Sequence, residues 1–437
     1  MLGAGFGLAV ILGATVGGEI LRLPGSVAAL LPAPALFFLA WLLGGVYAGV
    51  SALSFAELGT RLPRSGGPTV FAGAALGPFA GFVVGWADFL ASAFTISAYA
   101  LVLGELVTAM GLPGPGRAWA ALVIGALGLP QWSGLRWGAL VQDLSSAGKG
   151  ILLLGLGLCA LCLPGAAPGP RPAPPGAGGL LAFVGAMQLV CFAYDNYYSS
   201  VYFGEEYTDP RRQIPRSLAS GVLLVTGLYL ILSWAMARAL PYGTLTGSEL
   251  PGAELAARIA GGGARLIQAV MLLALLSAMN ATLLIASRVL YALGSAGLAG
   301  AHAADVNPGG TPTTGLLATL ALALAGLALP SFETAIAFMS PFMLINYGFC
   351  FLSLLVLRRR LPDPGGIFRA PLFPWTPGLC LLVSLALLAG CFAADGRLAL
   401  AALGLLVLAW PLFRWTRRGR QAVARDPRSS RFFRRVG

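Results

Sequence analysis

Three ionisable side chains lie inside long apolar stretches of this sequence, where a charge needs a partner. Lys149, the only lysine, sits in the stretch 136–164, and Glu19 and Asp195 interrupt two others. If a helix enters a membrane near Gly138, Lys149 lies about 16 Å in, near the middle of a hydrocarbon core about 30 Å thick. A charge at that depth indicates a binding or ion-coupling site, unless the side chain extends back to the interface.

The sequence around each of the two acids predicts a break in its helix. Residues 13–25 contain helix-weakening glycines followed by Pro-Gly, and residues 191–206 contain Asp-Asn and two serines in an apolar run. Broken backbone at membrane depth is tolerated only where it lines a cavity or is buried in protein. Freed N–H groups favour a carboxylate and freed C=O groups favour an ammonium, so such a site suits a zwitterionic amino acid. The alternative, two intact glycine-rich packing helices, leaves both acids without partners.

Membrane-spanning helices must position these residues, and the composition agrees. The chain is 57% hydrophobic and only 10% charged, with a mean hydropathy of +0.82, which excludes an ordinary soluble domain. A short helix near 72–81 is expected to lead into the third span. The apolar runs predict an all-α integral membrane protein with twelve spans, near residues 3–31, 35–61, 79–110, 117–132, 138–163, 180–204, 215–240, 263–296, 313–330, 333–357, 373–393 and 396–413.

The predicted breaks fall in the first and sixth spans, so each opens a block of five. Blocks with an odd number of spans insert with opposite topology, an architecture of transporters that hold substrate at the broken helices. We therefore expect a single transmembrane transporter domain over 1–414, with repeats at about 3–163 and 180–357 and two extra helices at about 373–413. Residues 415–437 form an Arg-rich tail.

The arginines predict the orientation. With the N-terminus inside, the inner connections hold eleven arginines and the segment after Phe413 holds nine, against six on the outer side. We expect a multi-pass plasma-membrane protein with both termini cytoplasmic and a tail that contacts anionic lipid rather than nucleic acid. The six cysteines fall inside predicted spans and the only histidine, His302, lies in a loop, so no metal site or cofactor is expected.

Several segments together resemble the amino acid–polyamine–organocation superfamily, and within it the L-type amino acid transporter branch. The first span reads GATVGGEIL at 13–21, where the family typically has G-T-I-I-G-S-G-I-F, and 56–67 is similar to its A-E-L-G-x-x-x-P-x-S-G-G motif. FAYDNYY at 192–198 is similar to F-A-Y-G-G-W, SAMNATLLIASRVLY at 277–291 is similar to the eighth-helix motif, and Lys149 matches the fifth-helix lysine. The resemblance implies a leucine-transporter-like fold of two inverted five-helix repeats plus two C-terminal helices.

The resemblance also implies which residues do the work. It implies a substrate site on the first-helix backbone and at the sixth-helix break, at Ala14, Thr15, Gly17, Gly18, Phe192, Tyr194 and Asp195. It implies that Lys149 takes the place of the sodium ion of sodium-coupled relatives, near three polar residues of the eighth helix, Ser277, Asn280 and Thr282.

Two departures from the family pattern leave the substrate open. Glu19 and the Asp195-Asn196 pair stand where the family has glycine, so Glu19 joins the candidate substrate site. Arg22, three residues after Glu19 on the same helix face, would neutralise it. Otherwise the two acids bind a cationic substrate or carry a proton.

The predicted function is a sodium-independent amino acid transporter, either a proton symporter or an exchanger, that works by alternating access. A polyamine or other organic-cation carrier is the alternative. An integral-membrane enzyme is a remote one, because the sequence has no Gly-x-Ser-x-Gly elbow, HExxH motif or intramembrane histidine. The loop 111–117, where some family members attach a second subunit, has no cysteine, so no disulfide-linked partner is expected.

Weaker predictions concern other polar residues near the spans. Glu57 and Arg61 form an i, i+4 pair expected to stabilise a helix end. Asp88 is a candidate for the permeation route, as is Glu105 near the outer edge. Glu205 and Glu206 are expected to pair with loop arginines as part of an inner gate.

Overall fold

The computed structural model is a bundle of helices. It describes residues 3–31, 33–166, 179–248, 250–260, 264–360 and 365–416. Among these there is no β-strand, only two isolated bridges. The α-helices are α1 (Ala4–Thr15), α2 (Glu19–Leu30), α3 (Pro34–Arg61), α4 (Pro68–Leu76), α5 (Pro78–Ala109), α6 (Gly116–Ser133), α7 (Leu135–Leu161), α8 (Leu180–Ala193), α9 (Pro210–Ala239), α10 (Tyr242–Gly247), α11 (Pro251–Ala260), α12 (Ala264–Ser295), α13 (Thr313–Gly326), α14 (Phe332–Arg360), α15 (Trp375–Ala394) and α16 (Gly396–Val407).

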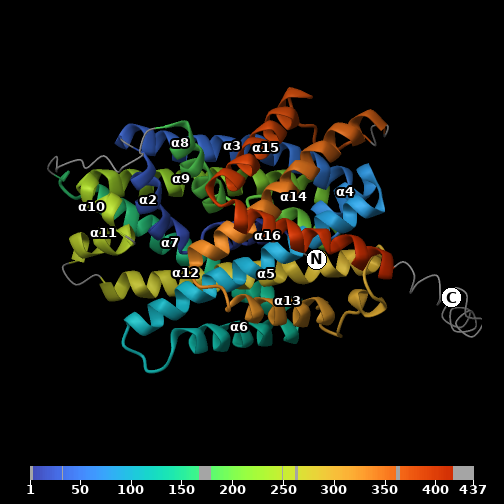
Figure 1. The fold of residues 1–437 in the computed structure, drawn as a ribbon, viewed down its shortest axis with the longest axis horizontal. Coiled ribbons are helices and arrows are strands. Elements are labelled where there is room, and N and C mark those ends of the chain that lie inside the picture. Colours follow the sequence, from blue (N-terminus) through green and yellow to red (C-terminus); the bar gives the residue numbers. More distant parts are fainter. Residues whose placement is uncertain are drawn as a thin grey trace, which may run out of the picture.

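The long helices pack around α5, which crosses the middle of the molecule beside α12 (Figure 1). The most apolar stretch of α5 is 94% buried, whereas those of α15 and α16 are 28% and 22% buried. Because α5 also packs against α14, α13 and α6, its apolar residues meet protein on every side. The outer helices instead expose leucine and tryptophan, as expected of surfaces that face lipid.

The predicted spans correspond to helices of the structure, and the all-α membrane fold is confirmed. By length and apolar composition, eight helices of the described residues can cross a membrane, or nine if the bent pair α1 and α2 is one span. Helices α8 and α13 are apolar but shorter. The count of twelve spans and the inverted repeats stay predictions.

The first span is broken where the sequence predicts. Helix α1 ends at Thr15, α2 begins at Glu19, and the two axes differ by 47°. The break falls over Val16 and the glycine pair that follows it, so these residues do not continue either helix. The carbonyls at the end of α1 and the N–H groups at the start of α2 are therefore left without helical partners.

The sixth span is also interrupted where the sequence predicts. Over 180–204 it is α-helical only as far as Ala193, and turns and two short 3₁₀ helices, Ser199–Tyr202 and Gly204–Glu206, carry the chain onward. Asn196 takes a positive φ of 65°, a conformation that asparagine tolerates better than most residues and that ends a helix. The polar cluster thus ends the helix at the predicted break.

Two smaller elements differ from the sequence-based expectation. The short helix expected near 72–81 begins at Pro68 and ends at Leu76, because Pro68 starts it and Gly77 follows in a left-handed conformation with φ 98°. Helices α10 and α11 were not predicted, since they are short and occupy the connection between α9 and α12. The Arg-rich tail from residue 417 onward lies outside the described residues.

Candidate functional site

Lys149 lies at the break in the first span. Its ammonium donates to Gly13 O at 2.8 Å and to Val16 O, two carbonyls at the end of α1. The side chain is fully buried, so the alternative in which it extends to the interface is wrong. A buried ammonium held by freed carbonyls is the arrangement that a bound cation would adopt at a helix C-terminus.

A polar stripe on α7 surrounds this lysine. Ser146 donates to Ala9 O of α1 at 2.8 Å, and Ser145 donates to Ser277 of α12 at 3.0 Å. Gln142 Oε1 accepts from Asn280 of α12 at 2.9 Å. Residues 142, 145, 146 and 149 lie on one helix face, a spacing that the sequence contained and that could have predicted the stripe. The face joins α7 to both α1 and α12.

Thr282, the third residue of the predicted coupling set, lies elsewhere. Its hydroxyl donates to Ala278 O at 2.9 Å, and its side chain lines a cavity of about 10 Å³ together with Asp88 and Asp195. A cavity of that size holds about one water molecule. Asp88 accepts from Tyr202 at 2.8 Å. The structure therefore places Thr282 with the two aspartates rather than with Lys149.

Glu19 starts α2 and its side chain folds back over the break. Its Oε1 accepts from Gly17 N at 2.7 Å, and its Oε2 is buried without a hydrogen-bond partner among the described residues. The expected pairing with Arg22 is wrong. Glu19 turns instead toward an N–H group that has no helical acceptor, and Arg22, nearly one turn further on, points away from it.

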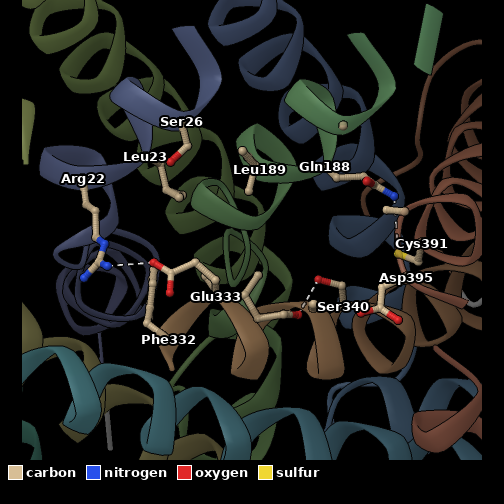
Figure 2. A pocket seen from close by; sticks show the side chains of 14 residues that line it. Arg22, Leu23, Ser26, Gln188, Leu189, Phe332, Glu333, Ser340, Cys391 and Asp395 are labelled. Atoms are coloured by element: carbon tan, nitrogen blue, oxygen red, sulfur yellow. Dashed lines mark hydrogen bonds and ion pairs between the residues drawn. The ribbon is translucent and has the colours of Figure 1, made fainter. Parts of the chain in front are cut away.

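Arg22 instead lines a pocket of about 160 Å³ between α2, α8, α14 and α15. It pairs with Glu333 at 2.7 Å and with Glu105 at 3.3 Å. Figure 2 shows Arg22 reaching toward Glu333, with Gln188 and Cys391 further along the same pocket. Both partners are far from Arg22 in the sequence, so its spacing from Glu19 could not reveal them.

Asp195 lies just after the end of α8. It accepts from the Tyr347 hydroxyl of α14 and from Asn196 Nδ2 at 3.1 Å. Tyr194 points the other way, donating to Trp41 O at 3.2 Å and packing its ring against Tyr229. Tyr194 therefore contacts α3 and α9 rather than the space at the break.

The remaining predicted substrate residues are also buried. Phe192 packs edge-on to Phe332 with ring centroids 6.4 Å apart. All eight residues of the predicted substrate set are buried. The two breaks are therefore enclosed by protein in this conformation.

One residue that the sequence did not single out joins the two breaks. The Tyr229 hydroxyl of α9 lies 2.7 Å from Thr15 O and 2.9 Å from Ala193 O and can donate to either. These are the last residues of α1 and α8. A tyrosine in the middle of an apolar helix is typical of core packing, so the sequence does not distinguish Tyr229 from the other buried aromatic residues.

Two further groups of ion pairs involve acidic residues singled out in the sequence. Arg288 of α12 binds Glu206 at 2.7 and 3.2 Å and lies over the Phe203 ring at 4.4 Å. The expected partner was a loop arginine, so that prediction is wrong in its partner. The predicted Glu57–Arg61 pair is confirmed at 3.4 Å, although Arg358 of α14 binds Glu57 more closely, with Nε at 2.7 Å.

Among the described residues no group of histidine, cysteine, aspartate and glutamate is arranged to hold a metal ion. The six cysteines lie in the described part of the chain and are free thiols.

Comparisons with known proteins agree with this architecture. The sequence model of the amino acid permease family matches residues 7–397. The serine/threonine exchanger SteT of Bacillus subtilis is 26% identical over 406 residues, covering 90% of this chain and 91% of that protein. The large neutral amino acids transporter small subunit 2 of Mus musculus is 28% identical over 390 residues, covering 84% and 72%. The branched-chain amino acid permease BcaP of Lactococcus lactis is 25% identical over 406 residues, covering 86% of each.

Proposed function

Because this chain belongs to the amino acid permease family, we propose that it is a sodium-independent amino acid transporter, a proton symporter or an exchanger. It works by alternating access, with substrate bound at the breaks in the first and sixth spans. Members of the family are transport proteins that cross the membrane several times, and the chain is not an enzyme. Its substrate is a small molecule, carried across the bilayer that surrounds it.

The observation that carries the proposal is the position of Lys149. Its ammonium binds Gly13 O and Val16 O, the carbonyls that the break leaves free. An ammonium supplied by the protein at this point removes the need for a bound metal ion to neutralise them. The same side chain holds α7 against α1, as an ion shared by two helices would. Sodium independence follows from this substitution.

A neutral amino acid is the proposed substrate. The names of the similar proteins specify serine and threonine, large neutral amino acids and branched-chain amino acids. The breaks offer both kinds of backbone group that a zwitterion needs, N–H groups at the start of α2 and carbonyls at the end of α1.

We also propose that the protein resides in the plasma membrane with both termini in the cytoplasm, because arginines gather on that side. The Arg-rich residues after Thr416 would lie there against anionic lipid. No disulfide-linked subunit is proposed, since the connection between α5 and α6 carries no cysteine.

Uptake into proteoliposomes tests the proposal. Purified protein is reconstituted and given labelled L-serine, L-leucine and the diamine putrescine, in sodium medium and in medium with choline in place of sodium. We expect saturable uptake of an amino acid that is the same in both media. Strict dependence on sodium would contradict the role given to Lys149, and no amino acid uptake would contradict the function.

The alternative of an organic-cation carrier is favoured by one observation, the two buried acids Glu19 and Asp195 at the breaks. Buried carboxylates can balance the charges of a polyamine. Putrescine uptake without amino acid uptake would establish this alternative in the same experiment.

A further inference from the structure

The side chain of Glu19 accepts a hydrogen bond from the backbone N–H at the first break, where the carboxylate of a substrate would bind. Its Oε1 accepts from Gly17 N at 2.7 Å. A β-carbon at Gly17 would overlap Glu19 Oε2 and lie 3.0 Å from the carboxyl carbon. The glycine is therefore what lets a carboxylate lie directly against the break, and that carboxylate belongs to the protein itself.

The second oxygen of the same carboxylate has no partner. Glu19 Oε2 makes no hydrogen bond within the described chain, although the residue is only 2% exposed. A buried charged oxygen without a hydrogen bond is strongly unfavourable. The site therefore favours a species that brings a hydrogen to this oxygen.

Among the described residues, no arginine supplies that hydrogen. Arg22 of α2 pairs instead with Glu333 and Glu105. Lys149 interacts with Glu19 electrostatically, but its described hydrogen bonds go to Gly13 O and Val16 O. Next to the break, α12 presents the apolar side chains of Leu275 and Met271 to Gly18.

Besides Lys149, the titratable groups near Glu19 are phenols. Tyr99 of α5 interacts with the Glu19 carboxylate through its hydroxyl, and Tyr229 of α9 lies close to it. The helices packed against α2 direct their remaining titratable groups elsewhere in the structure: Asp195 after α8, Tyr47, Glu57 and Arg61 of α3, Tyr242 of α10, Glu254 and Arg258 of α11, and Arg238 of α9.

We infer that Glu19 is a proton-binding site in competition with the substrate: an amino acid carboxylate takes the Gly17 N–H only when Glu19 releases it and binds a proton. Two carboxylates held a few ångströms apart keep one proton between them. In the step, the Gly17 N–H···Glu19 hydrogen bond breaks, the substrate carboxylate accepts that N–H, and a proton from solution joins the Glu19 carboxylate. Zwitterion and proton bind together and leave together. This inference rests on the proposed function and selects proton symport from its alternatives.

Proton uptake on binding is the direct measurement. Purified wild-type protein in weakly buffered detergent solution is mixed with L-serine or L-leucine, and a pH-indicator dye reports bound protons. We expect about one proton for each amino acid bound. Substrate affinity should rise as the pH falls, by at most about tenfold per pH unit for one linked proton.

The Glu19→Gln variant isolates the site, because the amide oxygen can still accept from Gly17 N but carries no charge. We expect this variant to bind amino acid without proton uptake and with an affinity that does not change with pH. In proteoliposomes it should exchange labelled for unlabelled amino acid, yet a pH gradient should no longer drive accumulation. Glu254→Gln is the matched control: Glu254 is exposed on α11, so this variant should behave as wild type.

Three outcomes would overturn the inference. If the wild type binds amino acid without proton uptake, the inference about Glu19 is wrong and the proposed function is unaffected. Proton uptake that persists in Glu19→Gln assigns the proton to another group. Transport of putrescine with no amino acid transport makes Glu19 the counter-charge of a cation and removes the proposed function as well. If Glu19→Gln does not yield monodisperse protein, the wild-type proton measurement alone decides.

Discussion

At the scale of single residues, the structure resolves how charges survive inside an apolar bundle. Lys149 is satisfied by backbone carbonyls, Asp195 by a tyrosine hydroxyl and an amide, and Glu57 by two arginines. Glu19 alone among these has a buried oxygen without a partner. A site that satisfies most charges and leaves one acceptor open is suited to bind a ligand there rather than only to stabilise the fold.

Replacing Lys149 should abolish transport. Lys149→Met keeps a chain of similar length but removes the donor to Gly13 O and Val16 O, and each buried carbonyl left unpaired costs about 1–3 kcal/mol. We expect uptake to fall by more than about tenfold, since 1.4 kcal/mol already changes an equilibrium tenfold. Uptake of labelled amino acid into proteoliposomes measures this, and Lys149→Ala should behave alike.

The matched control is Ile151→Met, on the same helix but 72% exposed toward lipid. It should transport as wild type at equal membrane expression. Full activity in Lys149→Met would refute any role of the ammonium in the transport cycle.

From the sequence it was possible to predict that these residues matter, but not which residues they contact. Burial in an apolar run predicts that a charged residue matters, because the cost of an unpaired charge depends only on its local environment. It does not predict the partner, because that depends on how helices pack. Arg22 and Glu19 share a helix face, yet Arg22 binds Glu333, 311 positions away. Asp88 likewise binds Tyr202 from another element.

At the scale of helices, the last residues of the two half-helices meet at one hydroxyl. Tyr229 contacts Thr15 O and Ala193 O, so α9 fixes the ends of α1 and α8 relative to each other. Hydropathy predicted where α1 and α8 lie, because apolar periodicity is local. It could not predict this junction, because the junction depends on how α9 packs against both helices.

Removing the Tyr229 hydroxyl should loosen the substrate site. Tyr229→Phe keeps the ring contacts with Trp41 and Tyr194 and loses a hydrogen bond worth about 0.5–1.5 kcal/mol. We expect the substrate dissociation constant to rise by about twofold to tenfold, measured by equilibrium binding of labelled amino acid.

Tyr242→Phe provides the comparison, because Tyr242 also donates to a backbone carbonyl, Leu31 O at 3.0 Å, near the end of α2. Both variants should lose similar thermal stability, and only Tyr229→Phe should lose affinity. Equal effects on affinity would make Tyr229 a structural residue without a positioning role.

Glu57 holds three segments together at the C-terminal ends of α3 and α14. It is fully buried and accepts from Arg358 at 2.7 and 2.5 Å, from Arg61 at 3.4 Å and from Ala370 N at 2.9 Å. Breaking a buried pair by removing one partner costs about 3–5 kcal/mol. Glu57→Ala should therefore lower the apparent unfolding temperature in detergent substantially, as followed by size-exclusion chromatography after heating.

The exposed pair between His302 and Asp305 gives the reference for that measurement. Surface pairs contribute roughly 0–1 kcal/mol, so Asp305→Ala should leave the unfolding temperature nearly unchanged. If Glu57→Ala is no less stable than Asp305→Ala, the contacts of Glu57 do not hold the ends of α3 and α14 together.

At the scale of the whole molecule, two separate pockets are each lined by an ion pair. Arg22 and Glu333 pair at the pocket between α2, α8, α14 and α15, which the proposed orientation places outside, and Arg288 and Glu206 pair at a pocket of about 170 Å³, which it places inside. In the proposed transport cycle these two pairs act as the outer and the inner closure of the substrate site. A site closed at both ends releases its ligand only after one closure opens, which is the physical content of alternating access. The inner arginine is 5% exposed and the outer one 18%, so the inner pair lies in the lower dielectric and should be the stronger closure.

Neutralising the Arg22–Glu333 pair and neutralising the Arg288–Glu206 pair should shift the equilibrium between outward-open and inward-open conformations in opposite directions. Glu333→Gln weakens the outer closure and Glu206→Gln the inner one, and each favours the state in which its own side is open. The native Cys391, which lines the outer pocket, reports the balance through its rate of labelling by a membrane-impermeant maleimide added outside. We expect Glu333→Gln to speed the labelling and Glu206→Gln to slow it, with the larger change for Glu206→Gln. The Cys391→Ser variant gives the background from the other cysteines. Changes in the same direction for both variants would mean that the two pairs hold the fold together and do not act as opposing gates.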